Sequence, residues 1–226
     1  MAAYRGVRER VTGVLLDVDD GVAATTPVPG CPRWTVTDLA AHLCGVCVDI
    51  LEGNLDGVGT APWADAHAER FAPLGLAAVL AQWNEVGPQV EALGPAFPPR
   101  PATQLVFDAT THEHDARGAI GVVGGRSAEA LAVPLAFIAG SLDARVRSEQ
   151  LPTLELRAPD GWSATAGEGS AEVELRASSF ELFRSFGGRR SLDQIRAMDW
   201  SADPEPYLAT FFVDTPLVPP KSPLIE

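Results

Sequence analysis

The pattern of apolar and polar positions changes once along the chain, close to Pro152. Before this residue, apolar side chains recur every three or four positions, which is typical of amphipathic helices. After it, apolar and polar residues alternate, which is typical of strands that bury one face. The first part predicts helices at 4–19, 36–51, 74–93, 103–123 and 127–148.

The second part predicts a smaller region of mixed structure. Short antiparallel strands are expected to begin at Leu154, Trp162 and Ala171, and helices are expected at 178–186 and 192–198. The chain therefore predicts an α+β protein with two domains. A helical bundle would occupy residues 1–150 and a small α+β domain residues 151–226.

Two segments between the helices are expected to be loops. Residues 20–34 contain Pro27, Pro29 and Pro32, and prolines this close together exclude a helix. Residues 52–73 are rich in glycine, alanine and aspartate and contain Trp63 and His67. Either side chain could line the mouth of a substrate site, but a solvated loop is the simpler expectation.

Composition and charge narrow the class of protein. With 46% hydrophobic and 21% charged residues, the 226-residue chain has the composition of a globular protein. Its net charge of −13 argues against nucleic-acid binding, which requires a basic surface. No apolar run approaches the roughly twenty residues of a membrane helix, and the N-terminus lacks the apolar core of a secretion signal. We therefore expect a cytoplasmic protein that binds no membrane.

Three cysteines, Cys31, Cys44 and Cys47, are too few for a disulfide framework. Cys44 and Cys47 have the spacing of a redox or zinc pair. However, they lie in the middle of a predicted helix, and the chain has no second pair. We expect both to be small residues of the core.

The helix at 103–123 carries the richest cluster of chemically active residues. At about 3.6 residues per turn, Asp108, His112 and Asp115 share one face, whereas Glu113 and Arg117 point elsewhere. A carboxylate and an imidazole four residues apart can bind one metal ion together. The alternative is a solvated helix face with ion pairs such as Glu113–Arg117.

Another histidine, His42, lies in the helix at 36–51. Thr35 and Asp38 have the spacing of a capping box, which predicts where this helix begins. His42 lies at the edge of the apolar face of the helix. It is therefore either a hydrogen-bonded histidine of the core or a ligand that joins the residues of the later helix.

Three stretches together resemble one known family. In the first stretch, residues 29–43, Pro29 and Trp34 precede His42. The second stretch is an acidic-x-x-x-His run, Asp108-x-x-x-His112-x-x-Asp115. The third follows the predicted strands and reads Gly187-Gly188-Arg189-Arg190. The chain thereby resembles the mycothiol-dependent maleylpyruvate isomerase family. The resemblance implies a DinB-like four-helix bundle followed by a small sterol-carrier-like domain.

The resemblance also implies a metal centre. Its ligands would be His42, Asp108 and His112, with Asp115 beside them as a group that supports a ligand or faces the substrate. Three protein ligands leave one position open, which is typical of catalytic zinc. The expected cofactors are a divalent metal, most simply zinc, and the thiol mycothiol. The expected activity is isomerisation or thiol S-transfer on a small electrophilic substrate.

Arg189 and Arg190 would then bind an anionic substrate if the small domain closes over the bundle. The alternative is that both are surface or salt-bridged arginines. The family usually has glutamate where this chain has Asp108, so a non-catalytic metal- or ligand-binding module with a decayed site is the alternative function. A zinc-dependent hydrolase that uses metal-bound water is a third. Bundles of this kind often form homodimers.

Overall fold

The computed structural model describes residues 1–213 and 215–226. The chain divides into two compact units, Met1–Gly125 together with Glu226, and Arg126–Ile225. Both units contain helices, and the second also contains a four-stranded sheet. The predicted α+β class is therefore confirmed.

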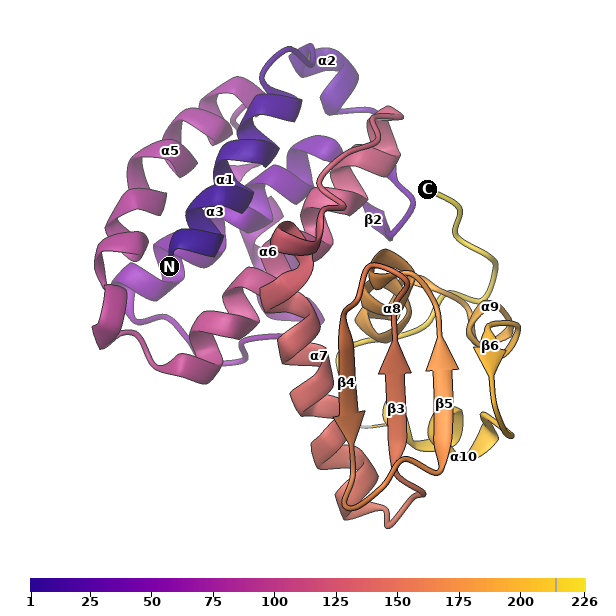
Figure 1. Cartoon of the computed structure of the whole chain (residues 1–226). Coiled ribbons are helices and arrows are strands. Elements are labelled where there is room, and N and C mark those ends of the chain that lie inside the picture. The colour runs from indigo at the N-terminus through magenta and orange to yellow at the C-terminus, as the bar shows by residue number, and fades with distance from the viewer. Residues whose placement is uncertain (214) are drawn as a thin grey trace. The chain divides into compact units, whose positions relative to one another are not determined.

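Four long helices form the bundle of the first unit (Figure 1). They are α1 (Ala2–Leu15), α3 (Val36–Glu52), α5 (Leu76–Ala92) and α6 (Pro99–Ile120). Helices α1 and α3 each pack against both α5 and α6. The apolar faces predicted from the sequence meet in this core, where Leu39, Val79 and Trp83 are fully buried.

Local signals define the ends of the helices that matter most for the site. The Asp38 amide donates to Thr35 Oγ1 at 3.3 Å, and the Thr35 amide donates to Asp38 Oδ2 at 2.8 Å. The predicted capping box is thus present at the start of α3. Helix α6 ends at Gly121, whose φ of 70° lies in the left-handed region that favours glycine.

The prediction of loops at 20–34 and 52–73 was wrong. The first segment contains α2 (Asp20–Ala23) and a hairpin of β1 (Pro27–Val28) and β2 (Cys31–Thr35), and the second contains α4 (Ala61–Phe71). Thr60 caps α4 by accepting from the Trp63 amide, and Pro62 lies in its first turn. Helix α4 buries only His67 and Phe71, so its apolar pattern is weak. A short 3₁₀ helix, η1 (Gly94–Ala96), precedes α6.

The second unit has a sheet of strand order β4–β3–β5–β6. Its strands are β3 (Leu154–Arg157), β4 (Ser163–Ala166), β5 (Val173–Arg176) and β6 (Asp199–Trp200). Strands β3 and β5 are parallel, so the expectation of purely antiparallel strands was wrong. After the β3–β4 hairpin, the chain crosses to the other side of β3, and β5 therefore runs in the direction of β3.

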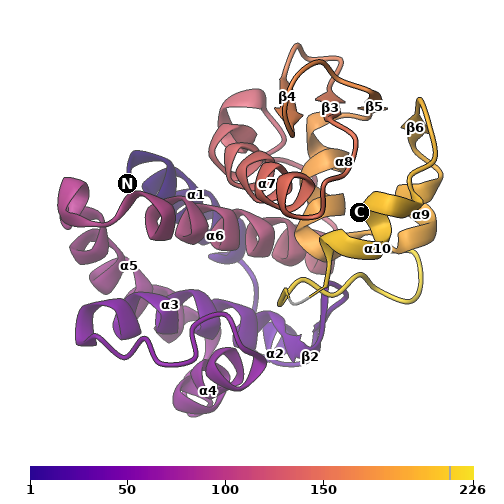
Figure 2. The ribbon, with the colours of Figure 1, turned by 90° about the horizontal axis from the view of Figure 1, so that it is seen from below.

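Helices α7 and α8 lie on one side of this sheet (Figure 2). The helices of the unit are α7 (Ala128–Ser148), α8 (Ser179–Arg184), the single-turn η2 (Ser185–Arg189), α9 (Leu192–Arg196) and α10 (Glu205–Phe211). Leu154 and Leu156 point into the buried face, whereas Glu155 and Arg157 do not. The sequence placed α7 in the bundle, but in the structure it belongs to the second compact unit and packs against β4 and α8.

Candidate metal centre

Helices α3 and α6 bring together the three residues that the family resemblance implies as metal ligands. His42 Nε2 lies 3.5 Å from Asp108 Oδ2, and His112 Nε2 lies 3.6 Å from Asp108 Oδ1. One ligand atom from each of the three residues lies within 4.8 Å of the others. Because bonds from zinc to nitrogen or oxygen are about 2 Å long, ligand atoms around one ion lie roughly 3–4 Å apart. The three side chains have a spacing that could accommodate a shared cation.

The Nε2 atom of His42 is the observation that favours a metal ion here. The His42 side chain is 4% exposed, and in the described part of the chain its Nε2 atom makes no hydrogen bond, although it lies within ion-pair distance of Asp108 Oδ2, at 3.5 Å. A buried polar atom left without a partner costs about 1–3 kcal/mol. A cation bound to Nε2 would remove this cost, and the donor set of two imidazoles and one carboxylate suits zinc.

The other nitrogen of His42 faces the interior of the unit. Its Nδ1 atom lies 3.1 Å from Nδ1 of His67, and Nε2 of His67 lies 2.9 Å from Asp49 Oδ2. His67 is completely buried, so the expectation that it lies in a solvated loop was wrong. Burial lowers the pKa of His42 and of His67, and contacts with Asp108 and Asp49 oppose only part of this effect.

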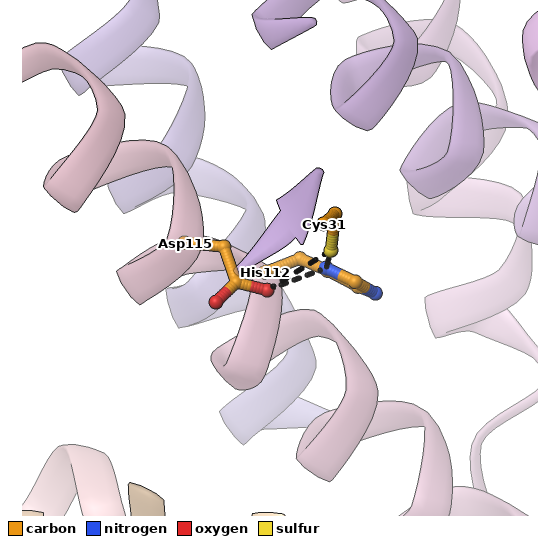
Figure 3. Close-up of side chains that lie close together, drawn as sticks. All are labelled: Cys31, His112 and Asp115. Atoms are coloured by element: carbon orange, nitrogen blue, oxygen red, sulfur yellow. Dashed lines mark hydrogen bonds and ion pairs between the residues drawn. The ribbon is translucent and has the colours of Figure 1, made fainter. Parts of the chain in front are cut away.

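His112 also has its second nitrogen in a hydrogen bond. Its Nδ1 atom lies 3.0 Å from Asp115 Oδ2, and the Cys31 thiol from β2 donates to the same oxygen at 3.5 Å (Figure 3). Burial alone would lower the pKa of His112, but the carboxylates of Asp108 and Asp115 and the contact with Cys31 together raise it to about 10. A positive charge at His112, either on the protonated ring or on a bound cation, is therefore favoured by the carboxylates of Asp108 and Asp115. Asp115 lies on the predicted face of α6, directly beside His112.

Aromatic rings form the walls around the two histidines. The Trp34 ring centroid lies 4.9 Å from that of His42 and 5.7 Å from that of His112. The Trp34 indole donates to Asp65 at 3.1 Å, which holds the ring in this orientation. In contrast to the buried histidines, the Asp108 side chain is 35% exposed. The site is thus enclosed by apolar surface on the side of the histidines and accessible from solvent at Asp108.

The two cysteines on α3 are confirmed as residues of the core. Cys44 and Cys47 are completely buried, and burial raises the pKa of Cys44 to about 12 and that of Cys47 to about 11. Neither thiol is a nucleophile at neutral pH. The predicted pair of Arg117 and Glu113 is also present, at 3.1 Å.

The remaining predicted site residues, Arg189 and Arg190, belong to the second unit. The Arg190 side chain is 4% exposed and forms an ion pair with Glu181 at 2.7 Å. Arg189 donates to the carbonyl oxygen of Gly187 at 3.3 Å. The ion pair of Arg190 favours a role in stabilising the turn after α8. Binding of an anionic substrate by either arginine stays a prediction.

The fold and the site together define a class of protein. The first unit is a DinB-like bundle in which α3 and α6 bring two histidines and a carboxylate within the distance that a shared metal ion would require. Residues 4–132, more than half of the chain, match the model of the mycothiol maleylpyruvate isomerase N-terminal domain family. The chain belongs to this family, as the sequence predicted.

Two solved structures share the fold. Both are crystal structures of the mycothiol-dependent maleylpyruvate isomerase, one of them of a mutant with a histidine replaced by alanine. They have TM-scores of 0.60 (the mutant) and 0.59, with 14% identity to this chain, and the similarity covers 88% of this chain and 90% of theirs. No curated protein matches the chain. In the described residues, no helix is long and apolar enough to cross a membrane.

Proposed function

We propose that this protein is a metal-dependent, mycothiol-dependent isomerase or thiol S-transferase that acts on a small electrophilic substrate. His42, Asp108 and His112 would hold the metal ion, with zinc as the expected ion. The observation that carries the proposal is the buried Nε2 atom of His42, which makes no hydrogen bond to any described residue and lies within ligand distance of Asp108 and His112. Membership of the family and the shared fold support mycothiol as the thiol.

Each residue of the site has a distinct task. The two buried histidines would hold the metal ion from the enclosed side, and the partly exposed Asp108 would hold it from the solvent side. Catalytic zinc sites typically have three protein ligands of this kind. When bound, the metal stabilises the thiolate form of the cofactor and so makes it a nucleophile near neutral pH. The ring of Trp34 keeps water away from the histidines.

The chemistry requires no cysteine of the protein as the nucleophile. When bound, the cofactor would supply a thiolate that adds reversibly to an activated double bond and so permits rotation about it; in an S-transferase the sulfur would stay bonded to the substrate. Alanine at Arg189 and at Arg190 tests the prediction from the sequence that these side chains bind the anionic part of the substrate, in which case KM should rise.

Metal content tests the proposal directly. Purified protein, loaded with zinc and dialysed, should contain about one ion per chain, and His42→Ala and His112→Ala should each lose it. Cys44→Ala is the matched control, because it removes a buried residue with metal-binding potential from the same helix without touching the three ligands. Zinc-loaded wild-type protein without bound metal would refute the proposal.

Turnover separates the alternatives. The proposed enzyme should convert electrophilic double-bond substrates only when mycothiol is added. Turnover without added thiol would favour a hydrolase that uses metal-bound water. Metal binding without turnover would favour the non-catalytic binding module, which the shorter Asp108 side chain keeps as the alternative. The homodimer and the cytoplasmic location stay predictions from the sequence.

A further inference from the structure

A line of three buried side chains leads from the interior of the first unit to the candidate metal centre. Asp49 contacts His67 at 2.9 Å, and His67 contacts His42 at 3.1 Å. The three residues are 1%, 0% and 3% exposed, respectively. Asp49 and His42 lie on α3, and His67 lies on α4. The contacts therefore join two helices directly behind a proposed ligand.

The hydrogen-bonding capacity of these three side chains determines which atom donates and which accepts at each contact. The Asp49 carboxylate can only accept, so His67 Nε2 donates to it. Asp49 also accepts from Arg70 at 2.8 Å and from Asn54 at 3.2 Å. The positive charge of Arg70 disfavours a positively charged imidazole at His67, so His67 is neutral. A neutral His67 has no proton on Nδ1, which must therefore accept from Nδ1 of His42. The proton of His42 then lies on Nδ1, and the lone pair of its Nε2 faces the site.

The packing around His67 supports a specific orientation of its ring. A Cβ atom built on Gly45 would lie 2.4 Å from Cγ of His67, so only glycine at this point of α3 leaves room for the imidazole. On another side, the Trp63 ring lies 4.4 Å from the His67 ring, centroid to centroid, at an angle of 75°. The ring is therefore held by packing as well as by its hydrogen bonds.

We propose that Asp49 and His67 are positioning residues that hold His42 with its Nδ1 proton inward and its Nε2 atom toward Asp108 and His112. The proposal rests on the function proposed for the metal centre and extends it to two residues that do not touch the ion. Asp115 has the corresponding place at the other ligand, since it binds Nδ1 of His112. Both imidazoles would thus be oriented by a hydrogen bond at Nδ1, the nitrogen that does not bind the metal, as is general for histidines that bind metals.

The first experiment needs no metal. Long-range ¹H–¹⁵N spectra of the metal-free wild-type protein report which nitrogen of each histidine carries the proton. We expect His42 to be protonated on Nδ1 and His67 on Nε2. In His67→Phe, which retains a ring but removes the acceptor, the proton of His42 should redistribute toward Nε2. A wild-type His42 protonated only on Nε2 would overturn the proposal.

The second experiment measures zinc affinity by competition with a chelator. His67→Phe should bind zinc about 10–100-fold more weakly than the wild type, which is typical for loss of a residue that supports a metal ligand. Asp49→Asn retains an oxygen acceptor but loses the charge, so we expect a smaller loss. It also provides a test if His67→Phe does not fold. The control is His114→Phe, which replaces a buried histidine on α6 and should leave the affinity unchanged.

The two experiments separate the two proposals. Wild-type zinc affinity in both His67→Phe and Asp49→Asn would overturn the positioning role while leaving the metal centre intact. A wild-type protein that binds no zinc, but shows the expected protonation of His42, would refute the metal centre. In that case the orientation of His42 would remain established as a feature of the fold.

Discussion

Replacing Gly45 by alanine tests whether the contact between α3 and α4 is as close as the structure shows. Gly45 lies inside α3, and its backbone is not in the left-handed region, so an alanine could adopt its conformation. Alanine would even favour the helix by about 1 kcal/mol. Its Cβ atom, however, would lie 2.4 Å from Cγ and 2.5 Å from Cδ2 of His67, both in a fully buried ring.

The magnitude follows from what His67 must give up in moving away. Overpacking a buried site costs about 1–3 kcal/mol, and weakening the hydrogen bond from His67 to the charged Asp49 costs about 1.5–3 kcal/mol. After subtraction of the gain in helix propensity, we expect Gly45→Ala to lower the free energy of unfolding by about 3 kcal/mol. Zinc affinity should fall as well, because His67 would no longer hold His42.

Urea unfolding of the metal-free protein, followed by circular dichroism, measures this change. The matched control is Gly13→Ala in α1, where a new Cβ atom would meet nothing within 4 Å. This variant should be more stable than the wild type by up to about 1 kcal/mol. If Gly45→Ala proved as stable as Gly13→Ala, the close approach of His67 to α3 would be refuted.

Three further substitutions test the bundle that carries the site. Tyr4→Phe should cost about 1–2 kcal/mol of unfolding free energy, because it removes the acceptor of the buried Trp83 indole, 3.0 Å away; an unchanged urea midpoint would contradict this. Glu91→Gln should cost about 2 kcal/mol at pH 7. Burial raises the pKa of Glu91, but hydrogen bonds from two arginines of α1 outweigh burial and lower it, so the deficit should shrink as pH falls below about 4.5. A deficit of equal size in urea unfolding at pH 3 and pH 7 would refute this assignment. Thr35→Ala should lower the melting temperature through loss of about 1 kcal/mol of capping, whereas Thr35→Ser should not.

Features that depend on neighbouring residues were predictable from the sequence. The start of α3 at Thr35 and the end of α6 at Gly121 follow from capping chemistry within a few residues. The shared face of Asp108, His112 and Asp115 follows from the helical period alone. For the same reason the pairing of Arg117 with Glu113 could be predicted.

Other features had weak local signals or none. Helix α4 was missed because it buries a narrow face, although Thr60 followed by Pro62 is a usable start signal. The parallel pairing of β3 with β5 depends on where the chain crosses after β4, which no strand encodes by itself. The contacts of Asp49 with His67 and of His67 with His42 could not be predicted, because no short motif links residues 18 and 25 positions apart.

The sequence by itself determined the long helices, the capping of α3 and the face that Asp108, His112 and Asp115 share, because these properties arise from backbone geometry over one or two turns. It also carried the family resemblance that suggested His42 as a partner for Asp108 and His112. Only the tertiary structure decided that α3 and α6 pack with these side chains 3.5–3.6 Å apart. It also decided that α4 places His67 behind His42. Such distances depend on how the apolar faces of separate helices pack together, and that packing is a property of the whole core.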